Sequence, residues 1–163
     1  MIICILGKSN AGKTVFANYL SKKFNIDKVI TTTTRKPRAG EVNGIHYHFL
    51  ARAEAEKQIA GEKYVEYDRF NSQIYGCRYE DFDLKKNSFI VITPSGFRSL
   101  KKAFPEEVIG IYINPPFFTR IARILNRDKG NYVEALKRYL ADAKAFKGLD
   151  DVIEIRKVFK ILK

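Results

Sequence analysis

The stretch GKSNAGKT, residues 7–14, decides how the rest of the chain is interpreted. It matches the pattern G-x-x-x-x-G-K-[ST] in full, in which the backbone N–H groups of a glycine-rich turn surround phosphate oxygens. Gly7 and Gly12 permit a close backbone approach that a side chain would block. Lys13 adds a positive charge for the β- and γ-phosphates, and the hydroxyl of Thr14 is a ligand for Mg²⁺. The residues expected to bind ATP here are Gly7, Ser9, Asn10, Ala11, Gly12, Lys13 and Thr14.

The residues on either side of this loop have the pattern that the loop requires. Residues 2–6 are a continuous apolar run rich in β-branched side chains, which predicts a parallel strand covered on both faces. From about Lys13 onward, apolar residues recur at helical spacing, and a helix N-terminus favours an anion. Further strands are predicted at 89–93, 108–113 and 152–155, and further helices at 97–103, 117–125 and 132–146. Strands that alternate with helices predict a parallel sheet.

The middle third of the chain interrupts this alternation. It carries two expected half-exposed strands and a short helix, at 45–50, 64–70 and 53–60. We therefore expect an α/β fold with a three-layer P-loop core, in which helices cover both faces of a parallel sheet. This core would comprise residues 1–32 and 83–163, with a short lid near 126–132. Residues 33–82 would form a small inserted mixed α/β lobe.

Composition limits the class of partner. The 163 residues, of which 45% are hydrophobic, suffice for one compact domain with a small inserted lobe. Lysine and arginine number 30 against 18 acidic residues, which gives a net charge of +12 and predicts an anionic partner. Nucleotides, nucleic acids and acidic membrane surfaces all fit that charge, so charge alone does not choose between them.

Other features narrow the choice of partner and location. Cys4 and Cys77 lie far apart and have no metal-binding spacing, which favours a reducing, cytoplasmic location. The first apolar run is too short to span a bilayer and lacks the features of a signal peptide, so we expect no membrane partner. The chain has no recognisable nucleic-acid-binding motif, and we expect no nucleic-acid partner. We expect a monomer or a dimer.

A second polar segment, TTTTRKPRAGE at residues 31–41, combines hydroxyl groups with two arginines and a stiffening proline. A guanidinium group can donate two hydrogen bonds to one phosphate, which a lysine cannot do. We therefore interpret Arg35 and Arg38 as a clamp for a second phosphate. The alternative is a basic surface turn that pairs with local acids such as Glu41.

These segments together resemble the guanylate kinase family. Residues 31–49, TTTTRKPRAGEVNGIHYHF, are similar to that family's S-x-T-T-R-x-P-R-x-G-E-x-N-G-x-D-Y-x-F segment. Residues 64–78, YVEYDRFNSQIYGCR, are similar to the segment that begins F-x-E and ends Y-G-[ST], and INPP near residue 113 is a further match. The resemblance spans most of the chain. It implies transfer of the γ-phosphoryl group of ATP, with Mg²⁺, to a nucleoside monophosphate, GMP or dGMP.

The resemblance also implies roles for individual residues in the inserted lobe. Arg35, Arg38, Tyr47 and Tyr75 would hold the phosphate of the monophosphate, and Thr31 would lie near the base. Glu66 would read guanine, because an ionised carboxylate can accept hydrogen bonds from N1–H and the exocyclic amine side by side. The expected monophosphate-binding residues are Thr31, Arg35, Arg38, Tyr47, Glu66, Tyr75, Gly76, Cys77 and Thr93.

A third element is the arginine-rich segment RILNRDKGNYVEALKRYL, residues 123–140, which resembles the family's lid. Arginines of that lid reach the phosphates of both nucleotides. The residues expected to act in catalysis are Lys13, Arg35, Arg123, Arg127 and Arg138. Phosphoryl transfer depends on positioning and neutralisation of charge, so we expect no general base.

The chain departs from the family pattern at the base. Cys77 replaces a serine or threonine and is only a weak donor. In IVITPSG, Val91 and Thr93 stand where the family has two acids, and Ile155 and Arg156 replace an Asn-Asp pair near the adenine. Three interpretations remain: a kinase with weaker guanine preference, a kinase for another monophosphate, or a non-catalytic protein that binds a nucleotide or a phosphorylated partner. A nucleic-acid-dependent ATPase is a fourth, suggested by charge alone. The intact phosphate loop favours an enzyme.

Overall fold

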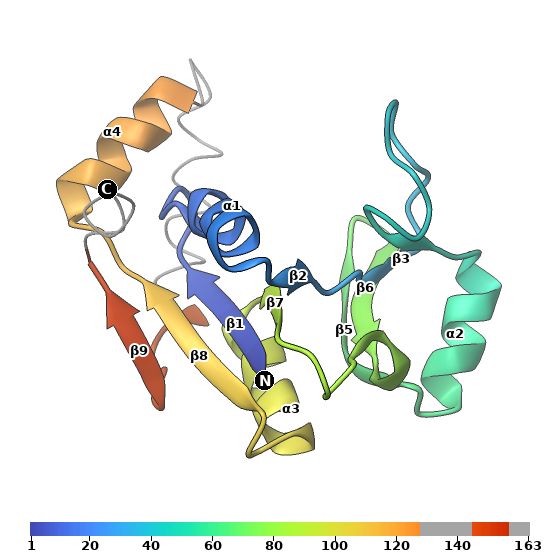
Figure 1. Cartoon of the computed structure of the whole chain (residues 1–163). Coiled ribbons are helices and arrows are strands. Elements are labelled where there is room, and N and C mark those ends of the chain that lie inside the picture. Colours follow the sequence, from blue (N-terminus) through green and yellow to red (C-terminus); the bar gives the residue numbers. More distant parts are fainter. Residues whose placement is uncertain (128–144, 157–163) are drawn as a thin grey trace.

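The structure is a computed structural model that describes residues 1–127 and 145–156. It contains two sheets that lie beside each other, one with five strands and one with four (Figure 1). The larger sheet belongs to the part of the chain that carries the phosphate loop, and the smaller sheet is built from strands between residues 32 and 78. Among the described residues, no helix is both long enough and apolar enough to cross a membrane.

The five-stranded sheet is parallel throughout and has β1 at its centre. Its strand order is β2-β7-β1-β8-β9. Ile2 pairs with Ser88 on one side and with Val108 on the other, and the register continues along both edges. The strands are β1 (Ile2–Gly7), β2 (Asp27–Lys28), β7 (Ser88–Val91), β8 (Val108–Ile113) and β9 (Val152–Ile155).

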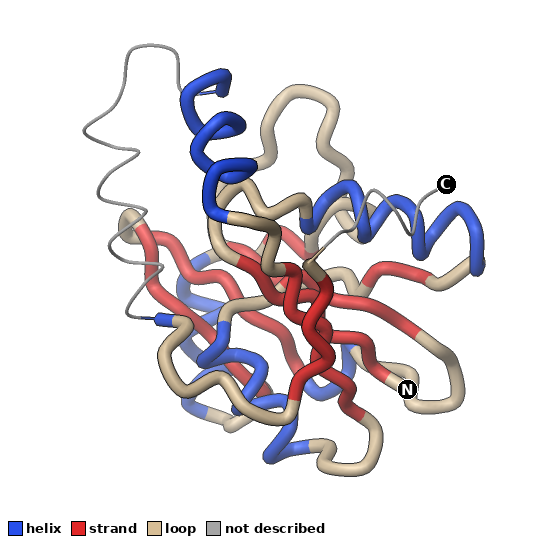
Figure 2. The backbone as a smooth tube through the Cα atoms, turned by 90° about the vertical axis from the view of Figure 1, so that its left-hand side faces the viewer, coloured by secondary structure: helices blue, strands red, loops and turns tan. Residues whose placement is uncertain are grey.

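Helices cover both faces of this sheet, as the tube in Figure 2 shows. On one face, Ile2, Cys4 and Leu6 of β1 belong to a buried cluster with Phe97 and Leu100. On the other face, the alternating residues Ile3 and Ile5 pack in a cluster with Phe16 and Leu20. The helices are α1 (Lys13–Phe24), α3 (Pro94–Ala103) and α4 (Phe117–Arg127). The predicted three-layer α/β fold is confirmed.

The four-stranded sheet is mixed and has the order β4-β3-β6-β5. β3 is parallel to β4, whereas β6 is antiparallel to both β3 and β5. The elements are β3 (Thr32–Thr33), β4 (His48–Phe49), α2 (Arg52–Ala60), β5 (Tyr64–Phe70), β6 (Gln73–Arg78) and the 3₁₀ turn η1 (Tyr79–Asp81).

One expectation for this part of the chain is wrong. The strand expected at 45–50 is reduced to the two residues of β4, because the chain turns at 43–47. The threonine-rich segment also contains a strand that the sequence pattern does not predict, since Thr32 and Thr33 are completely buried as β3, an inner strand. Threonine suits this position because its β-branched side chain favours a strand.

One testable consequence concerns Gly110 of β8, which lies between α3 and β9. A Cβ atom there would be 2.6 Å from Val152 Cγ1 and 2.8 Å from Phe97 Cζ. We expect Gly110→Ala to lower the free energy of unfolding by about 1–3 kcal/mol because it overpacks this layer. Urea unfolding would measure the change. The control is Gly61→Ala, whose Cβ would meet Lys57 O at an ordinary 3.4 Å. Equal effects of the two substitutions would contradict this account of the packing.

Candidate functional site

The phosphate loop connects the end of β1 to the start of α1. Gly12 has φ 105° and Asn10 has φ 60°, so two residues of the turn adopt left-handed backbone angles. At Gly7, a Cβ would be 2.9 Å from Ile113 O of the neighbouring strand. Glycine is therefore required at Gly7 by packing and favoured at Gly12 by conformation. The turn leads directly into α1 (Lys13–Phe24), and the N-terminus of a helix favours a bound anion.

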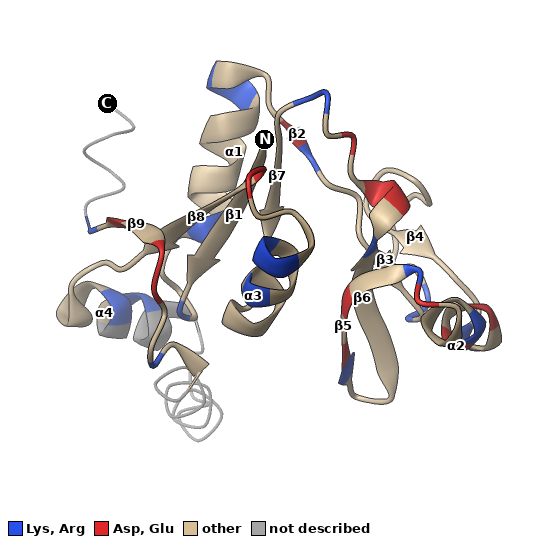
Figure 3. Ribbon diagram, turned by 90° about the horizontal axis from the view of Figure 1, so that it is seen from below, with Lys and Arg blue, Asp and Glu red and all other residues tan. Residues whose placement is uncertain are grey.

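Two cations lie over this loop, and they come from different helices. The ammonium group of Lys13 donates to Gly7 O at 2.6 Å and to Lys8 O at 3.2 Å. From α4, Arg123 Nη1 donates to the carbonyl oxygens of Asn10 at 3.2 Å and Ala11 at 3.1 Å. Figure 3 shows how lysine and arginine are distributed along α1, α3 and α4. The loop therefore lies in a positively charged part of the core.

A cavity of about 720 Å³ opens beside the loop. Gly7, Ser9 and Lys13 form part of its wall, and Asp68, Thr93 and Arg98 form another part. Thr14 lies exposed in the first turn of α1, and Ala11 is buried beneath the turn. The volume and the basic lining suit a polyphosphate chain.

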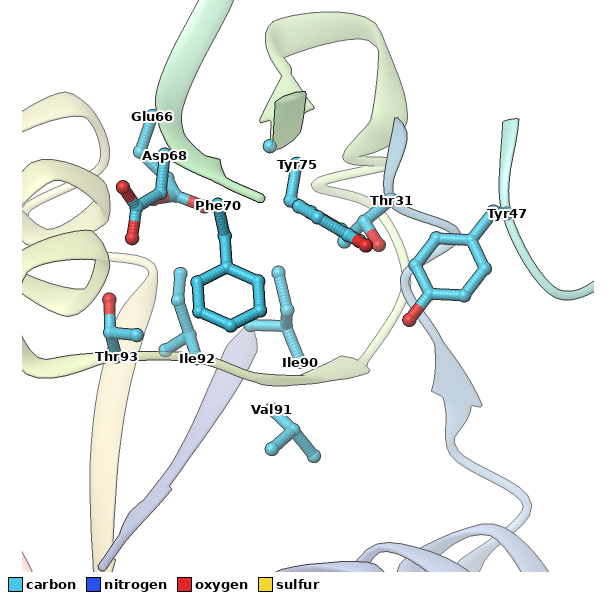
Figure 4. Close-up of a pocket in the computed structure, with 11 residues that line it drawn as sticks. Thr31, Tyr47, Glu66, Asp68, Phe70, Tyr75, Ile90, Val91, Ile92 and Thr93 are labelled. Carbon is cyan, nitrogen blue, oxygen red and sulfur yellow. The ribbon is translucent and has the colours of Figure 1, made fainter. Parts of the chain in front are cut away.

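A second cavity, of about 360 Å³, lies between the two sheets and is shown in Figure 4. It brings together six of the nine residues predicted to bind the monophosphate: Thr31, Tyr47, Glu66, Tyr75, Gly76 and Thr93. The two cavities share a wall, because Asp68, Val91, Ile92 and Thr93 line both. A ligand in one cavity therefore lies next to a ligand in the other.

Glu66 is the half-buried acid of the second cavity. A Cβ built on Gly96 of α3 would be 2.9 Å from Glu66 Oε2, so the carboxylate lies directly against the first turn of that helix. Desolvation by burial, with a smaller contribution from the charge of Asp68, raises the pKa of Glu66 to about 7. Near neutral pH the group is thus divided between an acid, which can donate, and a carboxylate, which only accepts.

Cys77 lies behind Glu66 on the adjacent strand. Its thiol donates to Glu66 Oε1 at 3.9 Å, a long and weak hydrogen bond. Burial raises the pKa of Cys77, with a further contribution from the charge of Glu66, so the group remains a thiol. Cys77 is fully buried and is predicted as a base contact, but the structure places its sulfur against Glu66 and not among the residues that line the cavity.

The predicted phosphate clamp is occupied by a local acid. Arg35 donates to Glu41 through Nη1 at 2.6 Å and Nη2 at 2.8 Å, and the backbone N–H of Arg38 donates to the same carboxylate at 2.7 Å. The hydrogen bond from Arg35 lowers the pKa of Glu41 to about 2. The Arg35 guanidinium also lies 5.2 Å from the ring centroid of Tyr47. Glu41 therefore orients Arg35 beside a residue of the cavity wall, whereas the side chain of Arg38 is exposed.

The predicted lid is described only in part. Arg127 is the last residue of α4, whereas Arg138 and residues 128–132 lie outside the described residues. Sequence reasoning missed several residues that line the two cavities, namely Asp68, Phe70, Ile90, Ile92 and Arg98. Asp68 could have been found, because it follows Glu66 by two residues in a strand and therefore lies on the same face.

The burial of Glu66 has a testable effect on stability. Between its ordinary pKa of 4.5 and the raised value of about 7, the folded protein keeps a proton that the unfolded chain has lost. The contribution of Glu66 to the free energy of unfolding therefore falls as the pH rises from 4.5 to about 7. We expect the free energy of unfolding of Glu66→Gln, relative to the unsubstituted protein, to be higher at pH 8 than at pH 5 by roughly 1 kcal/mol. Urea unfolding at both pH values measures this, and Glu54→Gln, at an exposed glutamate of α2, is the control. If the free energies of unfolding of Glu66→Gln and the unsubstituted protein differed by the same amount at both pH values, the raised pKa of Glu66 would be contradicted.

The chain is similar to known proteins of one family. The guanylate kinase family model matches residues 2–160. The chain is 34% identical over 148 residues to guanylate kinase from Neisseria meningitidis serogroup A, which covers 88% of this chain and 72% of that protein. It is 33% identical over 142 residues to guanylate kinase from Chlorobaculum tepidum, with coverage of 85% and 71%.

A solved structure has the same fold. A crystal structure of guanylate kinase from Anaplasma phagocytophilum superposes with a TM-score of 0.65 and 22% identity, over 99% of this chain and 80% of that one. Similarity to a structure at 22% identity shows a shared fold. Membership of the family is shown by the family model and by the sequence relatives. With its phosphate loop, its second cavity and this match over nearly its whole length, the chain belongs to the guanylate kinase family.

Proposed function

We propose that the protein is an ATP-dependent nucleoside monophosphate kinase that transfers the γ-phosphoryl group of Mg·ATP to GMP or dGMP. One observation carries the proposal. The cavity beside the phosphate loop and the cavity that contains Glu66 share a wall of four residues. A triphosphate bound at the loop and a monophosphate bound beside Glu66 would therefore lie next to each other, which direct phosphoryl transfer requires.

The donor side of the reaction would use the loop and the cations over it. The N–H groups of residues 7–14 would surround the phosphates of ATP, and Lys13 and Arg123 would exchange their present carbonyl partners for phosphate oxygens. Neutralisation of the charge that develops on the transferred group is the main catalytic requirement, and these cations supply it. Arg127 and Arg138 remain predicted members of this set.

Mg²⁺ would bind together with ATP. The hydroxyl of Thr14 is exposed at the start of α1, where a bound triphosphate would lie. No cluster of three or more acidic, histidine or cysteine side chains that could hold a metal is found within the described part of the chain. This fits Mg²⁺, which keeps several water ligands and binds through one or two protein groups and substrate phosphates. The ion would neutralise charge on the β- and γ-phosphates.

The acceptor side would use the second cavity. Ionised Glu66 would accept from N1–H and the 2-amino group of guanine, whereas adenine would present a lone pair at N1 to the same carboxylate. Tyr47, Tyr75, Arg35 and Arg38 would hold the phosphate, with Thr31 near the base. Glu41 already fixes the direction of Arg35, so less side-chain freedom is lost when the phosphate binds.

The sequence makes three further predictions. These are a cytoplasmic location, from cysteine usage, a monomeric or dimeric state, and no nucleic-acid partner. No observation favours the non-catalytic binding protein, since the relatives reported above are named as kinases. How strictly the base is selected depends on the residues around Glu66, where both acids of the family's core strand are replaced.

The test of this function is a coupled phosphoryl-transfer assay with Mg·ATP against GMP, dGMP, AMP, CMP, UMP and dTMP in parallel. We expect selective turnover of GMP or dGMP, because Glu66 accepts from two adjacent donors of guanine. Transfer to none of the monophosphates, with ATP binding retained in calorimetry, would overturn the proposal. Turnover of another base in preference to guanine would overturn the choice of substrate.

A second test removes the lysine of the loop. We expect Lys13→Ala to lower kcat by about 100-fold or more, because a charge aimed at the transferred phosphoryl group is lost. Lys22→Ala is the control, since Lys22 is an exposed lysine of the same helix. Thermal unfolding of both variants would show that the fold is kept. Unchanged activity in Lys13→Ala would contradict the role of the loop.

A further inference from the structure

Asp68 of β5 is an acid that has no role in the proposed binding of ATP or of the monophosphate. It lines both cavities and so lies at their junction. Among the residues that line the cavity beside the phosphate loop in the described part of the chain, it is the one acid. In the second cavity, the other acid among the described lining residues is Glu66. An acid at this place faces any ligand that extends from one cavity to the other.

Asp68 and Glu66 line the same cavity. Two positions apart on one strand, they point to the same side of the sheet, and Figure 4 shows their carboxylates next to each other above Thr93. The charge of Asp68 contributes to the raised pKa of Glu66, which supports their proximity. Asp68 Oδ1 accepts from the backbone N–H of Arg69 at 2.7 Å, which fixes the carboxylate and leaves Oδ2 for a ligand.

Among the described residues, the opposite wall of the cavity carries no acidic side chain. It is formed by Val91 and Ile92, which are apolar, and by Thr93. The hydroxyl of Thr93 accepts from Gly96 N at 3.2 Å and contacts Ser95 Oγ at 3.0 Å, because Thr93 caps the N-terminus of α3. Figure 3 shows acidic positions of β5 on the side of the smaller sheet that faces α3. The charged acceptors of this cavity therefore both come from β5.

Guanine has more N–H donors on this edge than one carboxylate can accept from. Its edge carries N1–H and a 2-amino group with two hydrogens, and one carboxylate can accept from N1–H and from one amino hydrogen. The second amino hydrogen then needs another acceptor, since an unpaired buried donor is costly. We propose that Asp68 is a specificity-determining residue, which accepts this hydrogen bond from the 2-amino group, so that β5 alone supplies both acids that read the base. This inference rests on the proposed kinase function and deepens it.

The test compares GMP with inosine monophosphate, which differs by the absence of the 2-amino group. We expect the unsubstituted protein to have a higher kcat/KM for GMP than for inosine monophosphate. Asp68→Ala should lower kcat/KM for GMP by about 10- to 100-fold and leave that for inosine monophosphate nearly unchanged. The control is Glu54→Ala, at an exposed acid of α2 that lines neither cavity. Thermal unfolding of each variant accompanies the kinetics.

Several outcomes would overturn the inference. Equal losses for the two nucleotides in Asp68→Ala would show that Asp68 acts on the phosphates or the metal, and unchanged kinetics would show no contact. Equal kcat/KM for the two nucleotides in the unsubstituted protein would overturn it without any variant, even if Asp68→Ala failed to fold. If the unsubstituted protein phosphorylated neither nucleotide, the proposed function would fail on its own. Calorimetric binding of the two nucleotides would then decide the role of Asp68, with equal affinities counting against it.

Discussion

β1 is hydrogen-bonded along both edges, to β7 and β8, and buried on both faces. Its position is thereby fixed, and with it the place where the chain leaves the sheet at Gly7. The carboxyl ends of parallel strands lie at one edge, so the end of β1 that carries the phosphate loop lies beside the end of β7 that leads to Thr93 and α3. Both cavities open at this edge. A sheet of another order would not bring the loop and the wall shared by the two cavities together.

The contact between α3 and β5 involves a small residue, Gly96, and a half-buried acid, Glu66. Gly96 leaves room for the carboxylate of Glu66 against α3, and the side chain of Ile92 fills the remaining space. An acid held there is partly desolvated, which disfavours its charged form. A ligand that offers two N–H donors repays part of this desolvation. The position therefore sacrifices stability of the free protein in favour of ligand binding, as is common at functional sites.

The sequence predicted the parts of the structure in which pattern and chemistry agree. The strands 108–113 and 152–155 match β8 and β9 because a sheet covered on both faces requires continuous apolar runs. β3 was missed because two buried threonines look like a polar turn, and their burial depends on neighbours distant in sequence. Glu66 was found through the family resemblance, whereas Asp68 was overlooked although the strand period places it beside Glu66. The sequence presents the pairing of a basic residue with Glu41 only as an alternative to a phosphate clamp, and the structure shows Arg35 paired with Glu41.

The division of charge between the two sheets has an evolutionary consequence. The cations around the phosphate loop belong to the core, and the two acids of the second cavity belong to one strand of the smaller sheet. Among the described residues, the wall that the core contributes to that cavity carries no charge. Under the proposed function, changes in β5 and β6 would therefore alter which base is accepted, while the residues proposed to bind the triphosphate stay as they are. Substrate choice would then be able to change within a short segment of the gene, and loss of acids from the core strand would not end the activity.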